Sequence, residues 1–266
     1  MTRSTARAEA RDTGRSRERG RYGRLRRFNV AVGLFHLVQG FVLLALANDL
    51  ALPVLATFLE DDPVAQQGPA TPELVFELPI GVLVATFIFF AAADHLLVAA
   101  PGVVRWYERK LVERANYARW IEYSISSSIM IVLIAAFVGI WDLAALAAIF
   151  AVNTTMILFG LLMERTERPG NADWSAFGFG TFAGLVPWLI LGVYLFVPDA
   201  PIPGFVYVIY LSLLVLFWSF AVNMALQYAQ IGRWRDYVFG EYAYIVLSLV
   251  AKTLLAWLIF GNVLRS

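Results

Sequence analysis

The sequence predicts an all-α membrane protein with seven transmembrane helices, and three observations support this fold class. Of the 266 residues, 60% are hydrophobic and 15% are charged, compared with about 45–50% and about 25% in an average soluble domain. Seven apolar runs reach the roughly 20 residues that cross a bilayer as a helix. The basic residues are concentrated on alternate sides of these runs, as in multi-pass membrane proteins. A soluble fold of this size would need a more polar surface.

The chain begins with a basic segment, residues 1–27, that contains ten arginines. No short apolar core with a cleavage site follows it, which excludes a secretory signal peptide, and its acidic residues argue against a transit peptide. We interpret the segment as a disordered cytoplasmic tail that touches anionic lipid headgroups.

The predicted transmembrane helices are separated by charged residues, prolines and glycines. Each holds about 20–25 residues, which is enough to cross a bilayer with modest tilt. They cover residues 28–48, 79–100, 120–141, 143–163, 174–197, 205–229 and 242–262. We therefore expect one seven-helix domain over residues 28–262, with a long linker at 49–78 and a short tail at 263–266.

The charges between the helices predict the direction in which the chain crosses the membrane. Nineteen of the 21 basic residues lie in residues 1–27 or in the linkers after even-numbered helices, whereas linker 49–78 holds six acidic residues and no basic one. By the positive-inside rule, the N-terminus is cytoplasmic and the C-terminus and linker 49–78 are extracellular. The expected location is the cell membrane.

Lys252 lies ten residues into the last predicted helix, where a lysine costs roughly 2.5–3.5 kcal/mol on insertion scales. It either pairs with a buried acid for structural reasons, or its amine forms a Schiff base with an aldehyde. A protonated Schiff base needs a nearby anion. Glu122 is already inside the third helix and is the best candidate, whereas Asp94 and Glu164 lie near helix ends and could be interfacial. An axial gap of roughly 12 Å between Lys252 and Glu122 shrinks if the third helix begins before Arg119.

Other kinds of site find little support in the sequence. With no cysteine and two histidines, a metal centre is not expected. Nucleotide-binding loops, zinc-protease motifs, nucleophile elbows and nucleic-acid folds are also absent. We therefore expect neither an enzyme nor a nucleic-acid-binding protein.

The seven helices and the lone lysine in the middle of the seventh resemble the retinal-binding seven-helix proteins. Arg119, Glu122 and Ser126 fall on the spacing found in the third helix of microbial rhodopsins. Ion-pumping members carry two further carboxylates, at positions that are Leu133 and Ser248 here.

These departures and the cytoplasmic N-terminus make the chain similar to the heliorhodopsin family. Residues 120–124 (Trp-Ile-Glu-Tyr-Ser), the Ser248–Lys252 spacing, His36, His95 and the long first extracellular linker carry the resemblance. It implies a photoreceptor with all-trans-retinal on Lys252 as a protonated Schiff base, Glu122 as counterion, a slow photocycle and no net ion transport. It also implies a homodimer, and signalling would need a cytoplasmic partner that the sequence does not identify.

Further side chains are expected near the chromophore. His36 and His95 would line a polar cavity that holds the released proton, although single histidines in helices are more often packing residues. The expected chromophore contacts besides Lys252 and Glu122 are Ser248, Ser126, Tyr123, Trp218, Trp188, Gln39 and Asn153.

Two other functions remain open from the sequence. One is a light-driven ion pump or channel. The other is a retinal-free transporter in which Lys252 and Glu122 form an ion pair in the substrate path.

Overall fold

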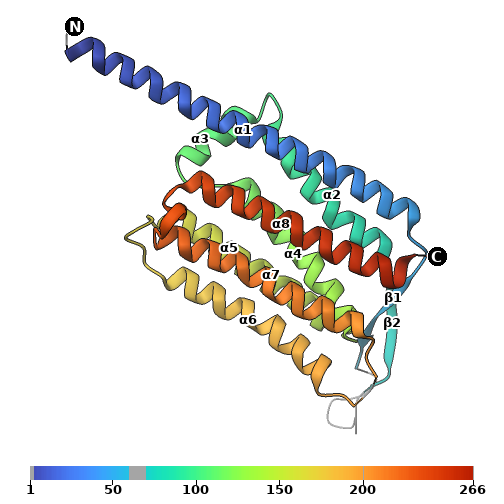
Figure 1. Ribbon diagram of the computed structural model, residues 1–266. Coiled ribbons are helices and arrows are strands. Elements are labelled where there is room, and N and C mark those ends of the chain that lie inside the picture. Colours follow the sequence, from blue (N-terminus) through green and yellow to red (C-terminus); the bar gives the residue numbers. More distant parts are fainter. Residues whose placement is uncertain (1–2, 60–69, 200, 266) are drawn as a thin grey trace.

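The computed structural model describes residues 3–59, 70–199 and 201–265. The described residues contain seven helices that are long and apolar enough to cross a membrane, which confirms the predicted seven-helix bundle. Six of them lie close to the predicted ranges, and their neighbours in sequence run in opposite directions (Figure 1). They are α2 (Ile80–Ala99), α4 (Tyr117–Phe137), α5 (Leu143–Thr166), α6 (Ser175–Phe196), α7 (Gly204–Tyr228) and α8 (Tyr237–Ile259).

The first helix, α1 (Arg3–Leu46), is much longer than predicted. Its apolar part covers Gly20–Leu46, and the rest projects beyond the bundle as a straight extension (Figure 1). Residues 3–27 are therefore helical, whereas the sequence analysis expected a disordered tail. Alanine, arginine and glutamate all have favourable helix propensity, and no proline interrupts the segment.

The long linker contains a β-hairpin, so the fold is mostly helical rather than all-α. Strand β1 (Ala51–Thr57) pairs antiparallel with β2 (Pro72–Pro79). The backbone N–H of Leu55 donates to the carbonyl of Trp141 at 2.9 Å, which attaches the hairpin to the turn between α4 and α5. Val54 and Thr57 in β1 and Val75 and Phe76 in β2 are of the residue types that favour strands, and the segments are too short to cross a membrane as helices.

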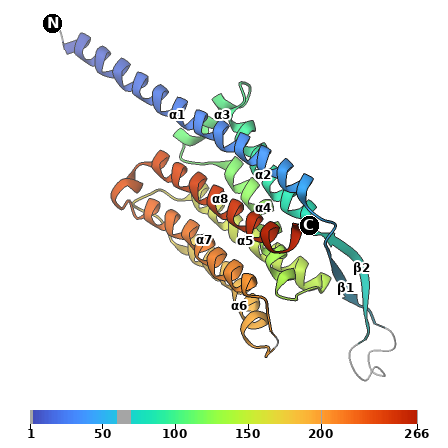
Figure 2. The ribbon, with the colours of Figure 1, turned by 45° about the vertical axis from the view of Figure 1, so that its right-hand side comes forward.

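Three short helices complete the described chain. Helix α3 (Val104–Val112) follows α2, a 3₁₀ helix η1 (Gly232–Arg235) connects α7 to α8, and a π-helix η2 (Phe260–Leu264) extends α8. At the end of η2, the carbonyl of Leu264 accepts a hydrogen bond from the backbone N–H of Asn48. The two chain ends lie at opposite ends of the bundle, with the hairpin at the C-terminal end (Figures 1 and 2).

Helix α4 is the central helix of the bundle. Of its most apolar 18-residue window 67% is buried, more than in any other described span. Toward the hairpin it contributes Ile131, Leu133 and Ile134 to an apolar core that also contains Leu213 and Leu255. The polar residues of α4 lie toward its N-terminus, and this distribution places the candidate site in the half of the bundle away from the hairpin.

Candidate functional site

Lys252 and Glu122 form a buried ion pair between α8 and α4. The ammonium Nζ of Lys252 donates to Oε1 of Glu122 at 2.6 Å, and the two residues are 3% and 6% exposed. Helix α4 begins at Tyr117, three residues before the predicted start, so Glu122 lies deeper in the helix than expected. The Nζ atom also lies 5.2 Å from the ring centroid of Tyr123, where a cation is attracted to the aromatic face.

An apolar cavity extends from Lys252 between helices α4, α5, α6, α7 and α8. The cavity and its opening to the surface together contain about 910 Å³ of space free of protein atoms. Five further residues that were expected at the chromophore line it together with Lys252, namely Tyr123, Ser126, Trp188, Trp218 and Ser248. Most of the remaining wall is aromatic or aliphatic, as in Trp120, Phe177 and Phe217.

Three residues expected at the chromophore are not among those that line this cavity, namely Glu122, Gln39 and Asn153. Gln39 on α1 accepts a hydrogen bond from Thr253, the neighbour of Lys252. Asn153 on α5 donates to the hydroxyls of Ser127 and Ser128 at 2.9 Å each, and thereby links α5 to α4. Contact of Gln39 and Asn153 with the chromophore therefore stays a prediction.

The residues of this cavity fit a long apolar aldehyde. A single buried amine lies at one end, and the walls present few polar groups. The hydroxyls of Ser126 and Ser248 are buried in the wall and have no hydrogen-bond partner within the described parts of the chain. Lys252 could hold retinal covalently, and the two hydroxyls could contact polar atoms near the linkage.

His36 and His95 lie together between α1 and α2. Their rings stack with centroids 6.1 Å apart and planes 10° from parallel, and both residues are buried. His95 Nδ1 lies 2.7 Å from Oδ1 of Asn29, whereas neither ring nitrogen of His36 has a partner among the described residues. The structure thus brings the two histidines together, as expected for a shared polar environment.

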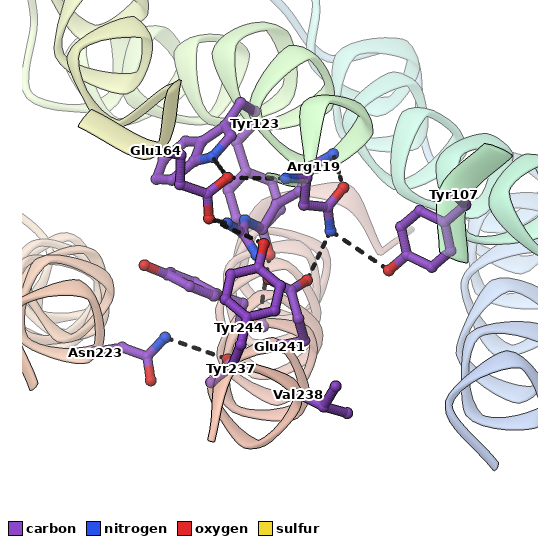
Figure 3. Close-up of polar contacts among 12 residues, drawn as sticks. Tyr107, Arg119, Tyr123, Glu164, Asn223, Tyr237, Val238, Glu241 and Tyr244 are labelled. Atoms are coloured by element: carbon purple, nitrogen blue, oxygen red, sulfur yellow. Dashed lines mark hydrogen bonds and ion pairs between the residues drawn. The ribbon is translucent and has the colours of Figure 1, made fainter. Parts of the chain in front are cut away.

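A second buried charge cluster joins three helices (Figure 3). The guanidinium of Arg119 on α4 forms ion pairs with Glu164 on α5 and Glu241 on α8, and all three side chains are nearly inaccessible. The Cζ atom of Arg119 lies 4.0 Å from the ring centroid of Tyr244 on α8, so the guanidinium also stacks on this ring.

Neutral donors complete this cluster. Glu164 accepts from the backbone N–H of Asn116 at 2.9 Å, from Trp120 Nε1 at 2.7 Å and from the Tyr237 hydroxyl at 3.2 Å. Glu241 accepts from the Asn116 side-chain amide at 2.7 Å. Both carboxylates are therefore well supplied with donors, as buried charges require.

Tyr107 covers the cluster from α3. Its hydroxyl accepts a hydrogen bond from Asn116 Nδ2 at 3.4 Å (Figure 3). Burial raises the pKa of the Tyr107 phenol well above its ordinary value, and the charges of Glu241 and Asp94 raise this pKa further. The phenol therefore remains protonated at physiological pH.

The sequence analysis did not find this cluster. Glu241 lies just outside the predicted last helix, Glu164 was a possible interfacial residue, and Arg119 was considered for its spacing to Glu122 and Ser126. The helical spacing of Glu241, Ser248 and Lys252 could have shown that Glu241 shares a face of α8 with the lysine. Glu164 is 6% exposed and lies in the last turn of α5, so it is a buried residue near a helix end.

Tyr123 connects the cluster to the lysine. Its hydroxyl donates to the backbone carbonyl of Tyr244 at 3.0 Å, and its ring faces both Lys252 and the cavity. The Arg119 cluster and the Lys252–Glu122 pair thus share the interface between α4 and α8.

Seven membrane-length helices around an apolar cavity that ends at a buried lysine define the class of seven-helix retinal proteins. The heliorhodopsin family model matches residues 25–264, which is nearly the whole chain. The protein therefore belongs to the heliorhodopsin family, and it is a rhodopsin-like, light-sensing membrane protein with a retinal chromophore. No curated protein matches the chain.

Proposed function

We propose that the protein is a photoreceptor that binds all-trans-retinal as a protonated Schiff base on Lys252, with Glu122 as its counterion. The observation that carries this proposal is the buried Lys252–Glu122 pair at the end of an apolar cavity. Retinal, when bound, supplies the polyene that absorbs visible light and isomerises.

Glu122 is the carboxylate best placed to balance the charge on Lys252. Glu164 and Glu241 are already paired with Arg119. Asp94 on α2 makes no ion pair with a side chain that the structure describes. Ser248, one helical turn before Lys252, supplies a neutral hydroxyl where ion pumps carry a second acid. Glu122 can therefore balance the positive charge of the protonated Schiff base by itself.

The walls of the cavity would hold the polyene. Trp188 is buried and packs edge-on against Tyr210 and Phe217, so it offers a rigid surface. We assign chromophore contact to Trp188, Trp218, Tyr123, Ser126 and Ser248. Gln39 and Asn153 act on the chromophore through Thr253 and the α4 serines.

A photocycle without net transport follows from where the polar groups lie. Glu122, His36 and His95 lie away from the hairpin, whereas the hairpin half of the bundle has an apolar core that includes Ile131, Leu133 and Leu255. A proton that leaves the Schiff base can enter the histidine region and return by the same route, which favours a slow cycle over vectorial transport.

We further propose that the protein lies in the cell membrane with the N-terminus in the cytoplasm and the hairpin outside. The arginine-rich start of α1 and the linkers that carry α3 and η1 share one end of the bundle (Figure 1), and the positive-inside rule assigns that end to the cytoplasm. By family resemblance the protein would be a homodimer that signals to a cytoplasmic partner. We assign it no enzymatic activity, because the heliorhodopsin family is not known as enzymatic.

Purification in the presence of all-trans-retinal tests the proposed chemistry. We expect a visible absorption band that hydroxylamine bleaches, because hydroxylamine attacks a Schiff base. A retinal-free transporter with a Lys252–Glu122 ion pair would give no such band.

A further inference from the structure

A second cleft opens at the end of the bundle away from the hairpin, among α1, the end of α3 and the start of α8. Three arginines from three separate segments line it, namely Arg21, Arg114 and Arg235. The other lining residues are Tyr22, Leu111, Val112, Asp236, Tyr237 and Val238.

The charges in this cleft are not balanced. Arg21 forms an ion pair with Asp236, the one acidic residue among the lining residues. Arg235 donates from Nε to the backbone carbonyl of Gln230 at 2.8 Å, and Arg114 makes no ion pair with a described side chain. The lining therefore carries an excess of two positive charges. A phosphate monoester carries about −1.5 to −2 charges at pH 7 and would match it.

The backbone around the cleft is held in an unusual conformation. Arg114 has φ of 59° and Gln230 has φ of 55°, and these two are the non-glycine residues with positive φ in the described chain. One of them lines the cleft, and the other accepts the hydrogen bond that orients Arg235. Each of them directly follows the C-cap residue of a helix, α3 or α7, where a left-handed residue commonly ends the helix. The two positive φ angles therefore fix how these helices end beside the cleft.

The floor of the cleft is rigid. Leu111, Tyr237 and Val238 are buried, and the hydroxyl of Tyr237 donates to Glu164 of the Arg119 cluster at 3.2 Å (Figure 3). Asp236, besides pairing with Arg21, accepts from the backbone N–H of Val238 and caps α8. The arginines thus surround a fixed floor, which lowers the entropy lost when an anion binds.

We propose that this cleft binds a phosphate monoester. Guanidinium groups form paired, charge-assisted hydrogen bonds with phosphate oxygens. The group could belong to a soluble phosphorylated metabolite or to the headgroup of phosphatidic acid. The cleft shares no lining residue with the retinal cavity, so its test does not depend on the proposed photoreceptor function.

The test uses the purified full-length protein and two probes that share the phosphate monoester. Glycerol 3-phosphate represents the soluble source and is titrated by calorimetry. Phosphatidic acid represents the lipid source and is compared by native mass spectrometry with phosphatidylglycerol, whose phosphodiester carries a single charge. The variants are Arg21→Gln with Arg235→Gln, the single Arg114→Gln, and the control Arg233→Gln.

Arg233 is a matched control because it belongs to the same 3₁₀ helix as Arg235, is exposed, and does not line the cleft. We expect the double variant to bind at least one probe about tenfold more weakly, because it removes two of the three guanidinium groups that line the cleft. Arg233→Gln should bind like the wild type. Binding of glycerol 3-phosphate supports the site and identifies a soluble source. Binding of phosphatidic acid without binding of glycerol 3-phosphate supports the site and identifies a lipid source.

Two results would overturn the proposal. One is that the wild type neither binds glycerol 3-phosphate nor prefers phosphatidic acid to phosphatidylglycerol. The other is that Arg233→Gln weakens binding as much as the cleft variants, which would show a general effect of surface charge. Size-exclusion elution and helical circular dichroism establish that each variant is folded, and Arg114→Gln replaces the double variant if that protein is misfolded.

Discussion

Lys252 and Glu122 carry the chemistry proposed at the scale of single residues. Removing the Lys252 side chain with Lys252→Ala should abolish pigment formation, because no other amine is available at the end of the cavity. Lys110→Ala is the matched control, since Lys110 is the only other lysine and pairs with Glu113 on the surface. Visible absorption after addition of all-trans-retinal provides the measurement, and immunodetection in membranes checks insertion.

A Lys252→Ala protein that still bound retinal covalently would remove Lys252 from its assigned role. Loss of pigment in Lys110→Ala as well would point to a general loss of folding.

Glu122→Gln removes the proposed counterion and preserves the size of the side chain. An opposite charge at this distance stabilises the protonated Schiff base. Without it, the visible band should be lost at a pH about 1–3 units lower than in the wild type. At neutral pH the absorption should shift to the blue, or to the red if chloride replaces the carboxylate. A spectrophotometric pH titration measures both effects.

Asp94→Asn is compared in the same titration, because the charges of both Lys252 and Glu122 act on the Asp94 carboxyl. If Glu122→Gln titrated like the wild type while Asp94→Asn did not, the counterion role would pass to Asp94.

The Lys252–Glu122 pair was predictable from the sequence because burying a charge is costly. A lysine in mid-membrane requires a buried acid, and few acids were available. The hydrogen-bond partners of Gln39 and Asn153 could not be predicted, because an amide can bond to any donor or acceptor within reach. Their actual partners, Thr253 and the α4 serines, depend on how the helices are rotated against each other, which one sequence does not fix.

Arg119 has its main effect at the scale of secondary-structure elements, where it fastens α4 to α5 and α8. Arg119→Gln would leave Glu164 and Glu241 buried without their cation, and breaking a buried pair in this way costs about 3–5 kcal/mol. The pigment should therefore bleach at a lower temperature. Arg105→Gln, on the exposed side of α3, is the control and should bleach at the wild-type temperature.

This prediction fails if Arg119→Gln bleaches at the wild-type temperature. The Arg119 cluster would then add nothing to the cohesion of the three helices.

Helices α4 and α5 approach closely at Gly160. A Cβ atom there would lie 2.4 Å from the indole of Trp120, which lines the cavity. Gly160→Ala should displace Trp120, lower the stability by about 1–3 kcal/mol and reduce retinal loading. Gly178 on α6 is the control, since a Cβ atom there meets nothing within 4 Å. Thermal bleaching and the ratio of visible to ultraviolet absorption measure the two effects.

Equal stability and equal retinal loading of Gly160→Ala and Gly178→Ala would show that the Trp120 side chain moves aside at little energetic cost. The cavity would then be less tightly shaped than its contacts indicate.

Helix positions were predictable because each span is a long apolar run, but their ends were not. Helix α8 begins at Tyr237 rather than at residue 242. Its first turn is separated from the long apolar run by Gly240 and Glu241, and it is stabilised by the Asp236 cap and by the pairing of Glu241 with Arg119. The hairpin was missed because its pairing joins strands separated by a long loop. Short apolar segments of this kind are ambiguous between strand and helix.

The separation of the bundle into a polar half and an apolar half belongs to the whole molecule. The hydropathy of the runs and the positions of the acids and histidines predicted this separation, and the buried apolar core next to the hairpin agrees with it. The orientation in the membrane rests on charge asymmetry, since seven crossings place the chain ends on opposite sides but do not say which is inside.

Light-driven transport is the measurement that tests the central claim most directly. Cells that express the protein with retinal are illuminated, and the pH of the suspension is recorded with and without a protonophore. In parallel, flash photolysis confirms that the pigment cycles. The account predicts a slow photocycle with no sustained pH change, because the proton leaves and returns through the same half of the bundle. A sustained, protonophore-sensitive pH change would contradict it and would identify the protein as a light-driven pump.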